Sequence, residues 1–189
     1  QGHHPSGDRR GTKADIYDGG HRVPFVVRWP GKVRPGSLSN HPVCLTDFLA
    51  TCAELLGTTL PDRAGEDSVS LLPLLLEQAD GPRREVLVHH SINGSFAIRE
   101  GKWKLLLCPD SGGWSDPKPG SAEASGLPDT QLFDLSTDPS ETRNLVAHHP
   151  EVVARLTERL KDVIAQGRST PGTPQANDAK IEIRKPLGR

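Results

Sequence analysis

The chain has 189 residues, with 23 Lys and Arg, 24 Asp and Glu and a formal net charge of −1. This near balance argues against a broad basic surface for nucleic acid or for an anionic membrane, and no apolar run is long enough to span a membrane. Aromatic residues make up only 4% of the chain, against 19 glycines and 17 prolines, which is typical of a loop-rich globular protein. The three cysteines show no C-x-x-C spacing, which disfavours a zinc site or a disulfide scaffold.

The first part of the chain predicts one strand and two helices. The run Phe25–Trp29 is apolar and β-branched and is bracketed by prolines, which indicates a buried strand. The segment 46–57, TDFLATCAELLG, has apolar residues at helical spacing, with a Thr-Asp pair at its start and a glycine at its end. The segment 68–78, SVSLLPLLLEQ, predicts a second, short helix with its proline in the first turn.

The pattern changes near residue 79 to short strands that follow one another. We expect strands at 84–91, 95–100, 103–108 and 130–135. The Asn-Gly pair in the first connection favours a tight hairpin, so the first three strands are predicted to form an antiparallel meander. The segment 148–167 predicts a helix that covers the sheet, which gives an α+β unit.

Two segments show no periodicity. Residues 109–129 form a long Gly- and Ser-rich stretch, and a loop of that length in a compact domain is usually functional or disordered. Trp114 within it is a candidate for stacking on a sugar or aryl ring. The polar, Pro- and Gly-rich tail after Arg168 is expected to extend over another surface.

Five segments stand in a particular order along the chain. They are GTKADIYDGGHRVPFVVRWPGKVRPGS (11–37), TDFLATCAELLG (46–57), SLLPLL (70–75), FAIREGKWKLLL (96–107) and QLFDLSTDPSETRNL (131–145). In sequence and in spacing, this series resembles the C-terminal half of the sulfatase family. The resemblance runs over nearly the whole chain, and the order of five segments is more specific than any one of them.

The resemblance implies an α/β domain of the alkaline-phosphatase-like fold followed by an α+β C-terminal subdomain with a four-stranded antiparallel sheet and a covering helix. Residues 1–78 would be the end of the catalytic domain, residues 79–167 the subdomain and residues 168–189 an extended tail. The sequence has no methionine and no signal peptide, so we expect it to be a fragment that lacks the N-terminal catalytic domain. The residues do not fix the compartment, whereas the family suggests a periplasmic or secreted protein.

The resemblance also implies hydrolysis of sulfate esters, with a sulfated small molecule or glycan as substrate. In sulfatases, the Cys or Ser of a C/S-x-P/A-x-R motif becomes formylglycine, whose hydrate attacks sulfur while calcium and basic side chains hold the anionic oxygens. No cysteine here begins that motif, and the serine of STPGT (169–173) has Thr in place of Arg. Calcium and formylglycine are therefore implied for the full-length parent, with neither bound by residues of this chain, which alone is expected to be inactive.

The first of the five segments contains the candidate catalytic residue. Lys13 occupies the position of a family lysine that contacts the sulfate, and a compact ammonium suits charge on sulfuryl oxygens. The other reading is a solvated surface lysine. Gly19 and Gly20 are expected to form a sharp turn with positive φ, and Asp18 and Arg22 are four residues apart and expected to pair across it.

Three further candidates for contact with the substrate are His21, His90 and Ser91, in addition to Trp114. His21 either lines the substrate pocket or is an ordinary hydrogen-bonded histidine. His90 and Ser91 lie where the resemblance brings subdomain loops near the cleft, and the alternative is a polar strand end. Because neighbouring strand residues such as His89 and His90 point to opposite faces, no metal site is expected there.

Two other functions stay open at this point. The chain is either part of a sulfatase or a non-catalytic module that binds anions or carbohydrates with the same subdomain. Hydrolysis of phosphate esters on the same fold is a related alternative. Trp103 and Lys104 in GKWKLL are interpreted as packing and edge-strand residues rather than catalytic ones.

Overall fold

The structure, a computed structural model, describes residues 6–78 and 80–185. Its helices are α1 (Asp18–His21), α2 (Asp47–Leu55), α3 (Leu72–Leu75) and α4 (Pro150–Gln166). Its strands are β1 (Val86–His90), β2 (Phe96–Glu100), β3 (Trp103–Leu106) and β4 (Gln131–Asp134). Within the described residues, no helix has the length and apolar character needed to cross a membrane.

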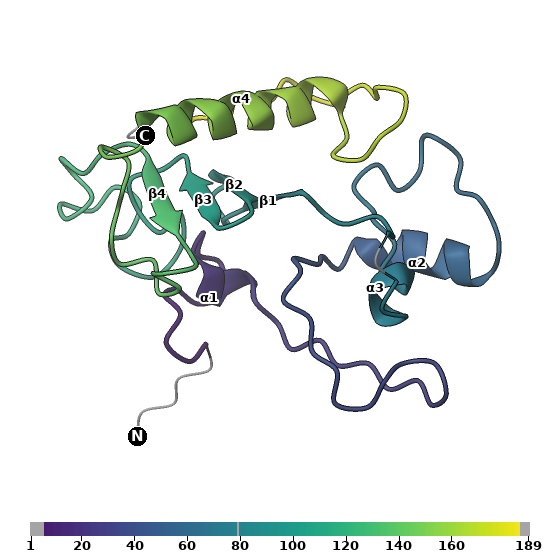
Figure 1. The fold of residues 1–189 in the computed structure, drawn as a ribbon. Coiled ribbons are helices and arrows are strands. Elements are labelled where there is room, and N and C mark those ends of the chain that lie inside the picture. The colour runs from purple at the N-terminus through teal and green to yellow at the C-terminus, as the bar shows by residue number, and fades with distance from the viewer. Residues whose placement is uncertain (1–5, 79, 186–189) are drawn as a thin grey trace. The chain divides into compact units, whose positions relative to one another are not determined.

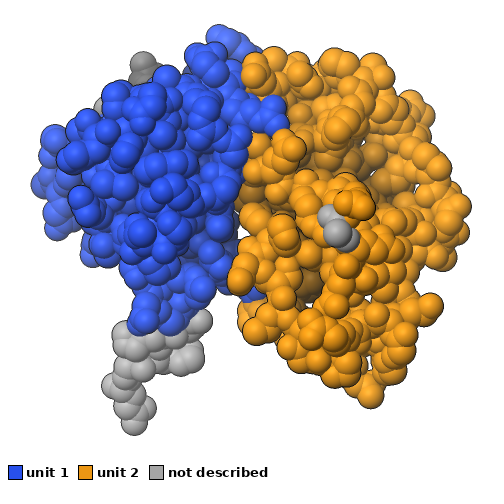
Figure 2. Space-filling view, in the orientation of Figure 1, with its two compact units in different colours: residues 1–23, 88–161, 180–189 blue, residues 24–87, 162–179 orange. Residues whose placement is uncertain are grey.

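The chain divides into two compact units (Figure 2). The first unit comprises Gln1–Val23, Val88–Lys161 and Lys180–Arg189, and the second comprises Pro24–Leu87 and Asp162–Ala179. The domain boundaries expected from the sequence stay a prediction.

The sheet lies in the first unit, except for the first two residues of β1. It has the order β1-β2-β3-β4, so the strands are neighbours in space as they are in sequence (Figure 1). Antiparallel register pairs Ile98 with Leu105, and Leu105 with Leu132. The predicted four-stranded antiparallel sheet and C-terminal helix are therefore confirmed. An alkaline-phosphatase-like remnant in the first part of the chain stays a prediction.

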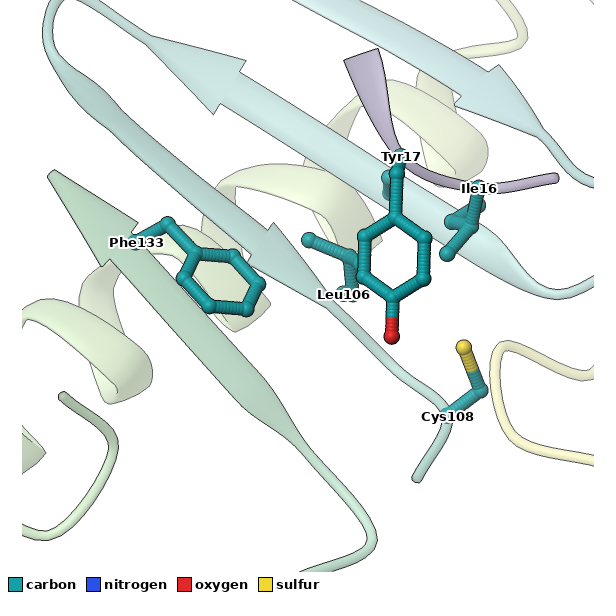
Figure 3. Close-up of a cluster of buried hydrophobic side chains, with 6 residues drawn as sticks. Ile16, Tyr17, Leu106, Cys108 and Phe133 are labelled. Atoms are coloured by element: carbon teal, nitrogen blue, oxygen red, sulfur yellow. The ribbon is translucent and has the colours of Figure 1, made fainter. Parts of the chain in front are cut away.

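Alternation along the strands gives the sheet two different faces. One face carries Ala97, Leu106 and Phe133, which pack with Ile16 and Tyr17 from the opening segment in a buried cluster (Figure 3). The rings of Tyr17 and Phe133 meet edge to face, with centroids 6.4 Å apart. The opening segment therefore forms part of the core of the sheet domain.

The other face of the sheet is on the side of α4. Glu100 pairs with Arg155, and Trp103 packs against His149 at a centroid distance of 4.9 Å. Helix α4 buries Val152, Leu156 and Leu160, because this i, i+4, i+8 series forms one stripe of the helix. Leu156 and Leu160 lie on the face that the apolar period of residues 148–167 predicts, and Val152 rather than Val153 begins the buried stripe.

Helix α2 begins and ends within one or two residues of the predicted segment, but it buries a different side. Asp47, Thr51 and Ala53 are buried, whereas Phe48 and Leu49, which the pattern assigns to the apolar face, are about half exposed. Polar contacts set the buried side of the helix, because Asp47 accepts hydrogen bonds from Cys44 N and Val69 N and forms an ion pair with Arg84.

The predicted strand at Phe25–Trp29 is absent, and this part of the prediction is wrong. These residues have no strand partner among the described residues, and Val26 is 89% exposed. A strand needs a neighbouring strand to satisfy its backbone, so β-branched composition alone does not form one.

Candidate functional site

Lys13 stands at the tip of a tight turn in the first unit. Asp15 N donates to Thr12 O at 3.0 Å, which closes the turn around Lys13 and Ala14. Ala14 has a φ of 88°, a left-handed conformation that side chains other than glycine adopt rarely. The Lys13 side chain is exposed. The turn thus presents an ammonium to solvent on a constrained backbone.

The Asp15 carboxylate, which is fully buried, holds this turn from inside. Oδ2 accepts from Thr12 N at 2.7 Å and from the Ser115 hydroxyl, and Oδ1 accepts from Trp114 N at 2.7 Å and Ser115 N at 3.0 Å. Burial acts to raise the pKa of Asp15, but the hydrogen bonds from Ser115, Thr12 and Trp114 outweigh it and lower the pKa below 3.8. The Asp15 carboxylate is therefore an anion that accepts each of these hydrogen bonds.

A third segment, the β1–β2 hairpin turn, joins the same place. Ile92 N donates to Ala14 O at 2.9 Å, and Asn93 N donates to Gly112 O at 3.3 Å. Ile92 and Trp114 remain 62% and 57% exposed. We call the exposed side chains of Lys13, Ile92 and Trp114 the Lys13 rim, because they leave from three backbone segments that are hydrogen-bonded to one another.

A buried ion-pair cluster supports the segment that follows Lys13. Lys104, on β3, is fully buried, and its Nζ lies 2.8 Å from Asp18 Oδ1 and 2.8 Å from Glu141 Oε1. Arg22 Nε donates to Asp18 Oδ2 at 2.8 Å, which is the pair that the four-residue spacing predicts. Burial raises the pKa of Asp18, yet the charge of Lys104 and the hydrogen bonds from Lys104 and Arg22 hold it well below 3.8.

Glu141 ties both ends of the Lys13 segment to one point. Its Oε2 accepts from Asp18 N at 2.6 Å, and its carbonyl oxygen accepts from Arg10 Nη1 at 3.1 Å. Burial raises the pKa of Glu141 above 4.5, against the opposing charge of Lys104. We call Asp18, Lys104 and Glu141 the Lys104 clamp. Its contacts hold the two ends of the Lys13 segment, at Arg10 and Asp18, in position.

The glycine pair has a different role from the expected one. Gly19 and Gly20 lie in α1, and neither has positive φ, so that expectation is wrong. A Cβ on Gly19 would lie 2.3 Å from Gly11 O and 2.5 Å from Arg10 O, and a Cβ on Gly20 would lie 2.6 Å from two carbonyl oxygens. The glycines permit close approach of two backbone stretches, which is the other reason for glycine at a turn.

The candidate histidines fall into two environments. The rings of His21 and His89 lie 4.1 Å apart, and His89 Nε2 lies 3.2 Å from Ile16 O. Burial, followed by the charge of Lys104, lowers the pKa of both rings, that of His89 well below 6.5. His90 packs instead against the Phe96 ring at 3.9 Å and is exposed.

Ser91 is buried and its hydroxyl is used within the hairpin. Its Oγ donates to Asn93 Oδ1 at 2.7 Å and accepts from Ser95 N at 3.2 Å. Ser91 therefore shapes the turn that carries Ile92.

The structure shows that the interpretation of Lys104 as an edge-strand residue is wrong. Strand β3 lies between β2 and β4, so both of its edges are paired. Lys104 is buried because it points to the face that the opening segment covers, where Asp18 and Glu141 neutralise it.

Comparison with known proteins gives the family. No protein-family model matches the chain. The chain is 39% identical over 165 residues to N-acetylgalactosamine-6-O-sulfatase from Bacteroides thetaiotaomicron and 33% identical over 167 residues to arylsulfatase A from Bos taurus, matches that cover 86% and 84% of it. The chain belongs to the sulfatase family.

The sulfatase chain spans about a third of these relatives, 31% of the first and 32% of the second. A solved structure from Bacteroides thetaiotaomicron, described with the metabolism of multiple glycosaminoglycans, matches 86% of the chain and 33% of its own, with a TM-score of 0.71 and 38% identity. A sulfatase from Pseudoalteromonas sp., at 24% identity, shares the fold over 87% of the chain and 34% of its own, with a TM-score of 0.65.

Three residues of the site in this sulfatase chain are missed by reasoning from sequence. Lys104 carries a usable signal, because it lies two residues before Leu106 and therefore on the same, inward face of a strand. A cation on that face requires buried anions. Glu141 and Asp15 carry no such signal, since contacts such as Asp15 with Ser115 and Asp18 with Glu141 join residues 100 and 123 positions apart.

Proposed function

We propose that this chain is the C-terminal part of a sulfatase that hydrolyses sulfate esters, and that Lys13 contacts the sulfate. The observation that carries the proposal is the Lys13 turn, in which an exposed ammonium stands on a backbone fixed by Asp15, Ile92 and Thr12. A positive charge held in place stabilises developing charge on sulfuryl and bridging oxygens without reorganisation during the reaction. The Lys104 clamp keeps both ends of this segment in place.

The residues of this chain do not fit the formylglycine or the calcium ion of the family. None of the three cysteines begins a C-x-P/A-x-R motif, and Cys108 is buried, with its pKa raised to about 12 by burial and by Asp110. Among the described residues, no three His, Cys, Asp or Glu side chains are placed to hold a metal. Nucleophile and calcium ligands are therefore assigned to another part of the protein, and no step through them is assigned here.

The substrate contacts proposed for this chain are Trp114, His21 and His90. Trp114 offers an exposed aromatic face beside the Lys13 turn, which suits the ring of a sulfated sugar or aryl sulfate. His21 and His90 are exposed enough to reach a ligand. Ser91 is better placed as a structural residue of the hairpin, because its hydroxyl is already bonded on both sides.

Exposed apolar residues of the second unit support the proposal that this chain is part of a larger protein. Several of its apolar side chains are exposed, among them Val26 at 89%, Leu38 at 98% and Leu56 at 80%. Apolar surface of this kind is typical of an interface, and the remaining two thirds of a sulfatase would supply its partner.

The proposal is tested with the longer gene product that contains this chain. It should release sulfate from a sulfated N-acetylhexosamine or an aryl sulfate, and should act far more slowly on the corresponding phosphate esters. Preference for phosphate esters would favour the phosphatase alternative. Binding of sulfated sugars without release of sulfate would favour the non-catalytic module. Either outcome would contradict the proposed activity.

A further inference from the structure

We propose that Asp15 is a positioning residue that couples Lys13 to Trp114, so that the sulfate and the ring of a sulfated sugar are recognised by one unit. This inference rests on the proposed function. It adds the residue that joins two contacts and commits the rim to a ligand that carries an anion and a ring. Asp15 itself touches no ligand, since its carboxylate is fully buried.

The first argument is the direction of the hydrogen bonds. Thr12 N and Thr12 Oγ1 donate to Oδ2 from the Lys13 side, at 2.7 and 3.3 Å, while Trp114 N and Ser115 N donate to Oδ1 from the loop side. The Ser115 hydroxyl also donates to Oδ2, so one oxygen is shared by the two segments. A carboxylate accepts all of these bonds and donates none, which no neutral side chain of this size can do.

The second argument is the close backbone packing around Asp15. A Cβ on Gly113 would lie 2.5 Å from Asp15 Oδ1 and 2.6 Å from Ala14 O, so the loop reaches the turn only because residue 113 is glycine. Ile16 N donates to Ser111 O at 2.8 Å on the other side of the contact. The two segments are therefore packed as one body rather than as two flexible loops.

The third argument is the chemistry of the exposed groups. The backbone of Trp114 is anchored, yet its side chain is 57% exposed, and Ile92, whose amide is bonded to Ala14 O, is 62% exposed. An aromatic ring on a backbone segment joined to the turn that carries an ammonium suits the apolar face of a pyranose whose sulfate meets Lys13. Because the sulfate and the ring are covalently joined, a shift of either protein segment would spoil both contacts.

Replacing Asp15 by Asn removes hydrogen bonds that join the Lys13 turn to the Trp114 loop, with almost no change in side-chain size. The amide keeps one oxygen, so it satisfies the donors of one side and presents N–H groups to the donors of the other. Asp110→Asn is the matched control, because Asp110 is also buried in this loop but accepts from Gly112 N, at 2.8 Å, and not from the Lys13 turn.

The first measurement is residue-resolved hydrogen exchange by NMR on the 189-residue chain. In Asp15→Asn, the Thr12 or the Trp114 amide should exchange about ten- to a hundredfold faster, as expected for loss of a hydrogen bond to a charged acceptor. Ser115→Ala, a milder change that leaves Asp15 in place, should also speed exchange at Thr12, about 100 residues away in sequence. In Asp110→Asn, Thr12 should exchange at the wild-type rate.

The second measurement is kcat/KM of the longer gene product on a sulfated N-acetylhexosamine. Trp114→Ala should lower kcat/KM by about three- to tenfold in the wild-type and Asp110→Asn backgrounds, and by less than about twofold in the Asp15→Asn background. An unchanged Trp114→Ala effect in Asp15→Asn, or unaltered Thr12 exchange in both Asp15→Asn and Ser115→Ala, would overturn the coupling while leaving sulfatase activity intact. No sulfate release by the wild type would instead overturn the proposed function and, with it, the ligand named here.

Discussion

Lys104 Nζ lies 2.8 Å from Asp18 Oδ1, although 86 residues separate them in the sequence. Lys104 belongs to an inner strand of the sheet and Asp18 to the segment that carries Lys13, so this contact attaches the proposed sulfate-binding turn to the middle of the sheet. Glu141 completes the neutralisation from a third segment. A buried cation with two anions is costly to disrupt because each remaining charge is left without water.

Lys104→Met should destabilise the chain by about 3–5 kcal/mol, since it leaves Asp18 and Glu141 as buried, mutually repelling carboxylates. Lys102→Met is the control: Lys102 also pairs with an aspartate, Asp134, at 2.6 Å, but its side chain is 51% exposed, so the expected loss is below about 1 kcal/mol. Urea unfolding of both variants separates the two values. Equal losses would contradict the assigned role of the clamp.

Stability should fall as the pH is lowered from about 7 to about 5. The pKa of His89 and that of His21 lie below 6.5 in the folded chain, because desolvation of the two rings and the nearby charge of Lys104 disfavour their protonated forms. The unfolded state therefore binds more protons below pH 6.5, and acidification favours unfolding. His89→Gln should flatten this dependence. Thermal midpoints at the two pH values test this, and an unchanged slope in His89→Gln would rule out His89 as the cause.

Gly19→Ala should destabilise the chain by about 3 kcal/mol, because a methyl group has no room between Gly11 O and Arg10 O. Gly120→Ala is the control, with open space around its Cβ and a φ of 75°, and should cost about 1 kcal/mol. Urea midpoints measure both. A smaller loss for Gly19→Ala than for Gly120→Ala would mean that the close approach of α1 to residues 10 and 11 is not required.

The parts of this fold that could be predicted from sequence are those with a local signal. The strands alternate over short runs, Asn93-Gly94 marks a hairpin, and the apolar period of α4 is helical over four turns. The apolar period places Leu156 and Leu160 on the buried stripe of α4, but it does not distinguish Val152 from Val153 at the start of the stripe.

The parts that could not be predicted depend on distant partners. Phe25–Trp29 has strand-like composition but no paired neighbour among the described residues. The lysine at position 104 becomes a buried cation only because Asp18 and Glu141 reach it. In the sequence, nothing distinguishes Asp15 from other acidic residues. Its role depends on the loop at Trp114, which is distant in sequence and contacts it in the fold. Of the predicted contacts, the Asp18–Arg22 pair follows from its four-residue spacing, whereas Asp15 and Glu141 could not be assigned from sequence. The role of Lys13 stays a prediction.

The chain alone should release no sulfate from an aryl sulfate, even with added calcium. None of its cysteines begins a C/S-x-P/A-x-R motif, and the serine that does, Ser95 of SFAIR (95–99), is buried with its hydroxyl donating to Asn93 Oδ1. Sulfate release by the purified 189-residue chain is the measurement. Turnover that a substitution within residues 1–189 abolishes would show that this chain has its own catalytic centre.

The most direct test of the account is kcat/KM for sulfate-ester hydrolysis by the longer gene product carrying Lys13→Ala. The expected loss is about 10²- to 10³-fold, as for removal of one preorganised charge stabiliser, with an unchanged thermal midpoint. Lys13→Arg should recover only part of the rate, because a planar guanidinium does not replace a point-like ammonium. Lys118→Ala, at an exposed lysine of the 109–129 loop, should change the rate by less than about twofold. A near-wild-type rate for Lys13→Ala would contradict the account and leave the Lys13 segment as a turn with no part in sulfate recognition.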